Sequence, residues 1–303
     1  MKMPRHTMSK WVLRGGLFLV AVVALTLASI AGLLFYQGRG ALDGTPDYVA
    51  LGSSFASGPG VTVRVPGSSL PCGRSADNYA HQLARKQHLS LVDMTCNGAT
   101  TENVLRRGQF FQPPQIAAVR AQTRLVTVTI GGNDVFYLRN LIALHCMNAP
   151  GDVPAWQHML GLCAPVPASD VEAAFVRLAA NMREIAVEVR RRAPHARLIF
   201  IPYLSVLPRT GTCTALGLTS AQADRMRAVG ARLHAMTREA ARAAGAGFLD
   251  AAAMSADHNA CAAVPWVNGF VFSLSSGKFP FHPNLAGMTA IADALNRTVQ
   301  LRK

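Results

Sequence analysis

The sequence predicts an α/β protein with three layers (α/β/α), in which helices cover both faces of a five-stranded parallel sheet, behind one N-terminal transmembrane helix. Short apolar runs rich in β-branched residues alternate with helical stretches, a pattern typical of parallel sheets. Half of the 303 residues are apolar, so a large core can form. An uncharged apolar run near the N-terminus accounts for the transmembrane helix.

This N-terminal run, from Gly15 to Tyr36, is long enough to cross a bilayer. Basic residues and no acidic ones precede it, which predicts a cytoplasmic N-terminus and an extracytoplasmic remainder. Ser29-Ile30-Ala31 could be a cleavage site, but the apolar stretch continues beyond it. We therefore favour an uncleaved signal-anchor over a cleaved signal peptide that would release a secreted protein. The predicted organisation is a cytoplasmic basic segment (1–14), the anchor (15–36), a linker (37–46) and one folded domain (47–303).

The formal net charge is +14, and the basic residues beyond the anchor are mostly arginines scattered over helical stretches. Neither aromatic interleaving nor zinc spacing accompanies them, which argues against nucleic-acid binding. Attraction to anionic lipid headgroups or envelope polymers is the expected consequence. We predict a monomer that meets the membrane through its N-terminal helix.

All six cysteines follow the anchor, and an even number of cysteines in an exported domain predicts three disulfides. No Cys-x-x-Cys pair occurs, which argues against zinc or redox chemistry, so we predict no metal and no organic cofactor. The count leaves the connectivity open. We favour a sequential pairing, which joins Cys72 to Cys96, Cys146 to Cys163, and Cys213 to Cys261.

Five short apolar runs are predicted as buried strands. They span 48–51, 89–94, 125–130, 198–203 and 247–249. Helices are predicted over 75–87 (with Ser75 as a possible N-cap), 169–192, 219–244 and 285–299. The segment 145–167 has two cysteines and poor periodicity, and is predicted to be a disulfide-tied excursion from the core.

Small or polar residues follow three of these strands closely. Ser54 lies in the turn Gly52-Ser53-Ser54-Phe55, Gly98 in the loop after the second strand, and Asn133 in Gly131-Gly132-Asn133-Asp134. Ligands bind beyond the carboxyl ends of parallel strands, so we expect the three residues to converge on one crevice. A serine where a strand breaks into a tight turn can be an activated nucleophile, although each residue alone also fits ordinary turn chemistry.

A serine nucleophile needs a base, and His282 is the main candidate among nine histidines. It stands between prolines at the entrance to the last predicted helix, where its ring can return to the sheet edge near Ser54. His258, beside a predicted disulfide, is a rival whose alternative role is structural. The backbone N–H groups of Ser54 and Gly98 and the side-chain amide of Asn133 would stabilise an oxyanion.

Four ordered blocks of the chain resemble the motifs of the SGNH/GDSL hydrolase family. They are Gly52-Ser53-Ser54, Asn97-Gly98-Ala99-Thr100-Thr101, Gly131-Gly132-Asn133-Asp134 and His282-Pro283-Asn284. The resemblance implies the SGNH hydrolase fold with a flavodoxin-like sheet. It also implies Ser54 as nucleophile, His282 as general base and acid, and the Ser54 N–H, Gly98 and Asn133 as oxyanion donors. The cysteine positions are most similar to the secreted, disulfide-containing lipase/esterase branch.

The chain departs from the family pattern at two positions. Ser53 stands where the family has an aspartate that supports the loop, so we expect altered loop hydrogen bonding with activity retained. Phe279 stands three residues before His282, where the family places the triad aspartate. We expect the backbone carbonyl of Phe279 to accept the Nδ1–H of His282, which gives a Ser-His dyad. Asp250 or Asp257 reaching from the preceding loop is the alternative.

The expected function is hydrolysis of carboxylic esters, of small molecules or lipids, by a membrane-tethered enzyme of the cell envelope that forms an acyl-serine intermediate. The loop 110–114 and the segment 145–167 are expected to shape the acyl pocket. Two alternatives remain open. One is the transfer or removal of acyl groups on envelope glycans, and the other is an inert binding module on the same scaffold.

Overall fold

The computed structural model describes residues 5–39, 45–271 and 278–299. At its centre is a five-stranded sheet of order β2-β1-β3-β4-β5, in which all neighbouring strands are parallel. The strands are β1 (Tyr48–Gly52), β2 (Leu91–Asp93), β3 (Leu125–Thr129), β4 (Arg197–Phe200) and β5 (Gly247–Phe248). In the register of the sheet, Tyr48 pairs with Leu91 on one side and Leu125 on the other. This confirms the flavodoxin-like parallel sheet expected from the sequence.

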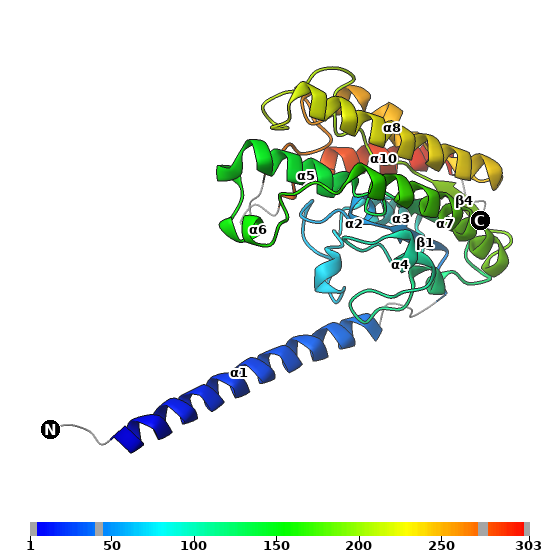
Figure 1. Cartoon of the computed structure of the whole chain (residues 1–303). Coiled ribbons are helices and arrows are strands. Elements are labelled where there is room, and N and C mark those ends of the chain that lie inside the picture. Colours follow the sequence, from blue (N-terminus) through cyan, green and yellow to red (C-terminus); the bar gives the residue numbers. More distant parts are fainter. Residues whose placement is uncertain (1–4, 40–44, 272–277, 300–303) are drawn as a thin grey trace.

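Helices form the two outer layers (Figure 1). On one face α3 (Tyr79–Gln87) packs against α10 (Leu285–Thr298). On the other, α7 (Ala168–Arg192) contacts α4 (Thr101–Leu105) and α8 (Ser220–Ala243), and α5 (Tyr137–Asn148) lies beside α8. Short elements occupy the connections: α2 (Ser54–Ser57), α6 (Ala155–Met159), α9 (Ala251–Met254) and the 3₁₀ turns Leu70–Cys72, Gln115–Ala118, Pro150–Asp152 and Ala256–His258.

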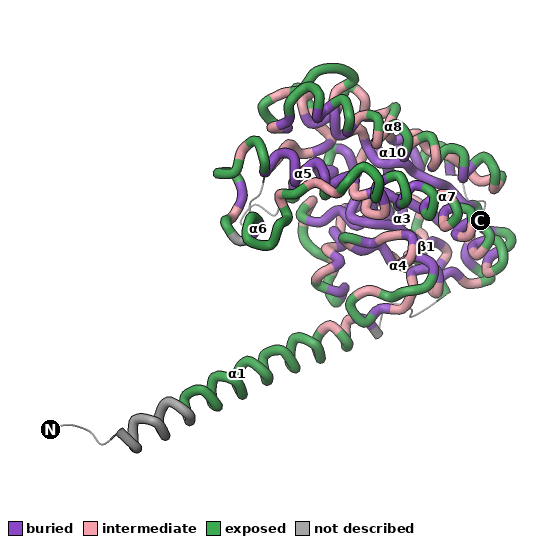
Figure 2. The backbone as a smooth tube through the Cα atoms, in the orientation of Figure 1, coloured by how far each residue is buried: buried purple, intermediate pink, exposed green. Residues whose placement is uncertain are grey.

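The core follows from the composition of the strands. Every residue of β1 and β3 is buried, as expected for a sheet covered on both faces. The helices contribute apolar stripes, as in α7, where Phe175 and Leu178 are buried while the arginines of the last turn lie near the surface. Figure 2 shows that buried residues are concentrated in the middle of the domain and that exposed residues lie along the outer helices.

The ends of the helices depend on individual caps. Thr219, the first residue of the helix predicted over 219–244, is the N-cap of α8. However, α3 begins at Tyr79 rather than near Ser75, because the backbone N–H of Asn78 bonds the Ser75 carbonyl in a turn at 3.2 Å. The Asn78 side chain then accepts the N–H of His81 and acts as the cap.

Helix α1 (Arg5–Arg39) projects away from the sheet domain (Figure 1). Its segment Gly15–Gly38 is apolar and long enough to cross a membrane, and its most apolar window has no side chains buried against the domain. The N-terminal apolar helix predicted from the sequence is therefore present.

The end of α1 contacts two loops of the domain. The rings of Phe35 and Phe111 meet edge to face with centroids 6.2 Å apart. The Gln37 Oε1 atom accepts the backbone N–H of Leu70 at 3.0 Å. A Cβ at Gly38 would lie only 2.6 Å from the Phe111 carbonyl oxygen, so this approach requires glycine.

Three disulfides join the six cysteines in the favoured sequential order, Cys72–Cys96, Cys146–Cys163 and Cys213–Cys261. The first ties the turn Leu70–Cys72 to the loop after β2. The second closes the excursion formed by the end of α5 and α6. The third joins the loop before α8 to the segment after α9.

Candidate active site

The proposed nucleophile, Ser54, is the first residue of α2, and only Ser53 separates it from the end of β1. Gly52 ends the strand with a φ of 154°, and a Cβ there would lie 2.5 Å from the Thr129 carbonyl oxygen, so only glycine fits. Ser54 is 3% exposed. Among the described residues its hydroxyl has no hydrogen-bond partner, which leaves the oxygen available to a substrate.

Gln115 fixes the strand end that precedes the serine. Its Oε1 atom accepts the Gly52 N–H at 2.7 Å, and its Nε2 atom donates to the Gly52 carbonyl at 3.0 Å. The N–H of Cys96 also donates to that carbonyl, at 3.0 Å. The turn is thereby attached to the loop that follows β2.

Ser53 is bonded by Tyr203, which follows β4. The Ser53 Oγ and the Tyr203 hydroxyl form a buried hydrogen bond. The Tyr203 ring stacks on Phe55, with centroids 3.9 Å apart. A Cβ at Gly132 would lie 2.2 Å from the same ring, so Tyr203 also presses against the loop that carries Asn133. One tyrosine therefore contacts both the turn that carries Ser54 and the loop that carries Asn133, and its bond to Ser53 is an altered hydrogen bond of the kind expected for that turn.

The two predicted oxyanion loops contact one another. Gly98 has a left-handed φ of 75°, and no atom lies within 4 Å of the position of a Cβ there, so this backbone faces open space. The Asn133 Nδ2 atom donates to the Ala99 carbonyl at 2.8 Å. Because the amide has two N–H groups, one remains for a ligand.

Asp134 anchors this pair of loops to α4. Its carboxylate accepts the Thr101 backbone N–H at 3.0 Å and also the Thr101 hydroxyl. Asn181 of α7 donates to the same hydroxyl at 2.8 Å. Burial raises the pKa of Asp134 to about 6, although the hydrogen bonds from Thr101 oppose the shift.

His282 is 7% exposed, and its ring lies beside the nucleophile turn, 5.6 Å from the ring of Phe55. Its Nδ1 atom is 2.7 Å from the Pro280 carbonyl oxygen. A carbonyl can only accept, so Nδ1 carries the proton and Nε2 is left as the basic nitrogen. Burial lowers the pKa of His282 to about 4, against the raising effect of the Pro280 bond, so the neutral imidazole is favoured.

The acceptor for His282 is therefore the carbonyl of Pro280 and not that of Phe279, which corrects the prediction. Phe281 adopts a left-handed φ of 60°, which folds the chain so that the carbonyl two residues before the histidine meets its own ring. The Phe279 carbonyl instead accepts the His282 backbone N–H at 3.4 Å and the Asn268 Nδ2 atom at 3.3 Å.

The alternative partners are engaged elsewhere. Asp250 bonds His234 and Arg238 and caps α9. Asp257 is exposed and lies 3.8 Å from an arginine of the surface. The rival base His258 donates from Nδ1 to a backbone carbonyl at 2.8 Å and stacks on a tryptophan ring, as a structural histidine does. Within the described ranges, no carboxylate contacts His282 and no hydrogen bond joins it to Ser54.

One group with the spacing of metal ligands occurs among the described residues, formed by Cys146, His158 and Cys163. Both cysteines belong to a disulfide, which removes the thiolates that would bind a metal.

Residues 50–290 match the model of the GDSL-like lipase/acylhydrolase family. The chain belongs to this family. Among curated proteins, this GDSL-like hydrolase is 33% identical to Lipase 2 of Streptomyces coelicolor over 258 residues, 82% of this chain and 84% of that protein. It is 27% identical to a lipase of Streptomyces rimosus, covering 80% of this chain and 82% of that one.

Solved structures share the fold of this GDSL-like hydrolase. Phospholipase A1 from Streptomyces albidoflavus superposes with a TM-score of 0.67 at 24% identity, over 83% of this chain and 98% of that chain. The extracellular lipase of Streptomyces rimosus superposes with a TM-score of 0.64 at 24% identity, over 83% and 99% of the two chains.

The sequence interpretation missed two residues of this site, Gln115 and Tyr203. Gln115 follows two prolines in a connection without a recognisable motif. Tyr203 carried a usable signal, because it follows β4 at the same sheet edge as Ser54 and Asn133.

Proposed function

We propose that this GDSL-like hydrolase cleaves carboxylic esters of lipids through an acyl-enzyme formed on Ser54, with His282 as base and acid in a Ser-His dyad. The observation that carries the proposal is the locked tautomer of His282. The Pro280 carbonyl holds the Nδ1 proton, which leaves a buried, neutral Nε2 beside the turn of a serine whose hydroxyl has no described partner. The names of the relatives, which are lipases and a phospholipase, support a lipid ester as substrate.

In the proposed reaction, the Ser54 oxygen attacks the ester carbonyl while the His282 Nε2 atom takes the hydroxyl proton. The N–H groups of Ser54 and Gly98 and the free N–H of Asn133 receive the negative charge of the tetrahedral intermediate. His282 then gives its proton to the leaving alkoxide, which departs as the alcohol. Water activated by the same nitrogen attacks the acyl-serine and releases the acid.

Two segments are proposed to border the acyl group. Phe110 and Phe111 are 40% and 58% exposed, and both have a positive φ. The neighbouring Gln109 donates to the Asn97 carbonyl at 3.4 Å, so this loop adjoins the oxyanion loop. On the excursion, His145 stacks on Phe270 with ring centroids 3.5 Å apart, close to the segment that carries His282.

We propose that the protein is anchored by α1, with residues 1–14 in the cytoplasm, 15–36 in the bilayer, 37–46 as a linker and the monomeric catalytic domain 47–303 outside. Support comes from the length and apolar character of α1 and from three disulfides, which persist in oxidising compartments. Intact mass of the membrane-extracted protein checks the anchor. The uncleaved chain has a mass of 32.3 kDa, whereas a shorter chain found in the medium would identify a cleaved signal peptide.

The catalytic assignment is tested with the full chain in detergent micelles. We expect it to hydrolyse p-nitrophenyl esters and to react covalently with a fluorophosphonate probe, and Ser54→Ala to lose both while keeping its thermal midpoint. Ser169→Ala, which alters an exposed serine at the start of α7, is the matched control. Undiminished turnover by Ser54→Ala would exclude Ser54 as nucleophile. Absence of labelling in the parent protein would indicate an inert binding module. Release of acetate from acetylated sugars in the same assay would identify a deacylase.

A further inference from the structure

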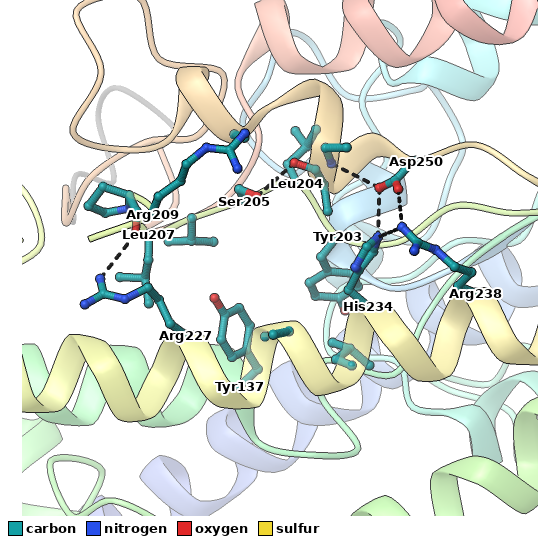
Figure 3. A pocket seen from close by; sticks show the side chains of 18 residues that line it. Tyr137, Tyr203, Leu204, Ser205, Leu207, Arg209, Arg227, His234, Arg238 and Asp250 are labelled. Carbon is teal, nitrogen blue, oxygen red and sulfur yellow. Dashed lines mark hydrogen bonds and ion pairs between the residues drawn. The ribbon is translucent and has the colours of Figure 1, made fainter. Parts of the chain in front are cut away.

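A cavity of about 380 Å³ has Tyr203 in its wall (Figure 3), and Ser54 is not among the residues that line it. It is bounded by α8, by the segment 203–209 that follows β4, and by α9. Tyr203 is a wall of this cavity as well as the partner of Ser53. The volume is within the range of small-molecule sites in proteins.

The hydroxyl of Tyr137 points into this cavity (Figure 3). Tyr137 is 5% exposed, and in the part of the chain that the structure describes its hydroxyl has no hydrogen-bond partner. The buried hydroxyls of Tyr48, Tyr79 and Tyr203 are all bonded to serine or threonine. Because the Tyr137 hydroxyl opens onto the cavity without a described protein partner, it is free to donate to a ligand that supplies an acceptor.

Glycine keeps the space beside this hydroxyl open. Gly230 lies inside α8, and a Cβ there would lie 3.1 Å from the Tyr137 oxygen. Glycine inside a helix costs about 1 kcal/mol relative to alanine. The helix therefore carries a destabilising residue where any side chain would crowd the hydroxyl.

The lining has more positive than negative charge. Arg209 and Arg227 lie at one end and Arg238 at the other, whereas Asp250 is the one carboxylate in the lining. Both oxygens of Asp250 are engaged, Oδ1 by His234 and Oδ2 by Arg238. Arg209 has a single ion pair among the described residues, an exposed contact of 3.8 Å with a carboxylate outside the cavity. Positive charge is thus available at the Arg209 end.

Apart from Ser205, the remaining wall is apolar and is formed by residues of the segment 203–209 and of the two helices. It includes Leu204, Val206, Leu207, Leu233, Ala252 and Ala253. We propose that this cavity is a second ligand site that binds a small amphiphile with an anionic headgroup, held by Tyr137 and Arg209, and a short apolar chain packed on this wall. The site adjoins the proposed catalytic centre through Tyr203, but Ser54 and His282 do not line it, and binding there does not depend on the catalytic chemistry.

The test uses full-length Ser54→Ala protein in nanodiscs of zwitterionic lipid, with empty nanodiscs as the blank for calorimetry. The probes are octanoate, octyl phosphate and octanol, which share a chain and differ in headgroup. We expect one of the two anions to bind at one site per chain, at least tenfold more tightly than octanol. Tighter binding of octanoate would identify a fatty acid as the natural ligand, and tighter binding of octyl phosphate would identify a phosphate headgroup.

Two variants locate the headgroup. Tyr137→Phe and Arg209→Gln should each weaken anion binding about tenfold, as expected for loss of a hydrogen bond to a charged group. Arg225→Gln, an exposed arginine of α8 outside the cavity, should bind as the parent does. Binding should also survive fluorophosphonate labelling of the Ser54 protein. Equal affinity for octanol, unchanged binding by either variant, or loss of binding on labelling would overturn the proposal.

Discussion

At the scale of single residues, Tyr203 contacts the turn that carries Ser54 at Ser53, the position where the resemblance led us to expect a supporting aspartate. It bonds Ser53, stacks on Phe55 and packs against Gly132. These contacts come from a residue 150 positions away in the chain, so no local motif could predict them. The sequence motif indicates only that the expected aspartate is absent at position 53. The fold shows that Tyr203 bonds the serine that stands there.

A pair of tyrosine variants tests this role. Tyr203→Phe leaves the buried Ser53 hydroxyl without its partner, and should lower the free energy of unfolding by about 1–3 kcal/mol and kcat about tenfold, with little change in KM. Tyr137→Phe removes a hydroxyl that has no described partner and should leave the free energy of unfolding unchanged or higher. Chemical denaturation and ester kinetics provide both readouts. Equal losses of stability in the two variants would contradict the assigned role.

The pH dependence of activity follows from the burial of His282. The imidazole acts as a base only when neutral, and its pKa is lowered from 6.5 to about 4. We therefore expect kcat/KM to hold its neutral-pH value as the pH falls to about 5, and to decline as it approaches 4. Between these pKa values the unfolded chain binds more protons at His282, so the contribution of this residue to the free energy of unfolding falls as the pH drops, whereas Asp134, with its raised pKa, contributes with the opposite sign.

A pH–rate profile of a soluble ester measures this limb, with His258→Gln as control because His258 is stacked and bonded away from the site. An acid limb centred near 6.5 in the parent protein would show that the histidine is solvated during turnover. Loss of activity in His258→Gln, with the fold intact, would identify the rival as the base.

At the scale of elements, the disulfide Cys72–Cys96 holds the oxyanion loop. Cys96 is followed directly by Asn97 and Gly98, and its N–H bonds the Gly52 carbonyl before the nucleophile. The disulfide Cys213–Cys261 joins the segment before α8 to the segment after α9, and neither cysteine adjoins the Gly98 loop in the chain. The two bonds should therefore have different effects on catalysis.

Replacing each pair by alanine separates stability from activity. Either double variant should lose about 2–5 kcal/mol of unfolding free energy. Only Cys72→Ala/Cys96→Ala should also lose at least tenfold in kcat, because the Gly98 N–H is no longer held toward Ser54. Kinetics at a temperature where both variants remain folded make the comparison. An equal fall in kcat for Cys213→Ala/Cys261→Ala would show that the effect is general destabilisation.

The elements of the sheet were predictable because their residues are buried on both sides. A short, continuously apolar run such as 125–130, in a chain where such runs alternate with helical stretches, indicates a strand covered on both faces. The rule for parallel strand ends predicts that Ser54, Gly98 and Asn133 converge, and hydrogen bonds connect the loops after the three strands, from Cys96 to Gly52 and from Asn133 to Ala99. The acceptor for His282 was not predictable, because it depends on a left-handed Phe281, a conformation that a bulky residue rarely adopts and that surrounding packing must impose.

At the scale of the whole molecule, the end of α1 and the active site share a loop. Phe111 contacts Phe35 of α1, and Gln109 of the same loop bonds the carbonyl of Asn97 beside Gly98. With α1 in a bilayer, this loop is held at the membrane surface together with the exposed side chains of Phe110 and Leu70. If α1 anchors the protein as proposed, these contacts would orient the catalytic domain as well as tether it.

Two glycine variants of α1 test that orientation. Gly38→Ala places a Cβ 2.6 Å from the Phe111 carbonyl oxygen and should separate the helix end from the domain. Gly32→Ala, in the same helix, meets nothing within 4 Å and serves as control. We expect Gly38→Ala to hydrolyse lipid esters in the proteoliposome membrane several-fold more slowly than Gly32→Ala. Hydrolysis of a soluble short-chain ester should be equal in the two, and a parallel loss there would point to a folding defect instead.

With α1 anchored as proposed, its contact with the loop 109–112 would also determine which molecules the enzyme can meet. A domain fixed at one end searches a plane instead of a volume, so its substrates are encountered at the density of lipids in the leaflet. The height of Ser54 above the bilayer would then select among substrates, because an ester bond must lie at that depth to reach the serine. Two esters of the same chemistry would be processed at different rates if one lies near the headgroups and the other near the middle of the membrane.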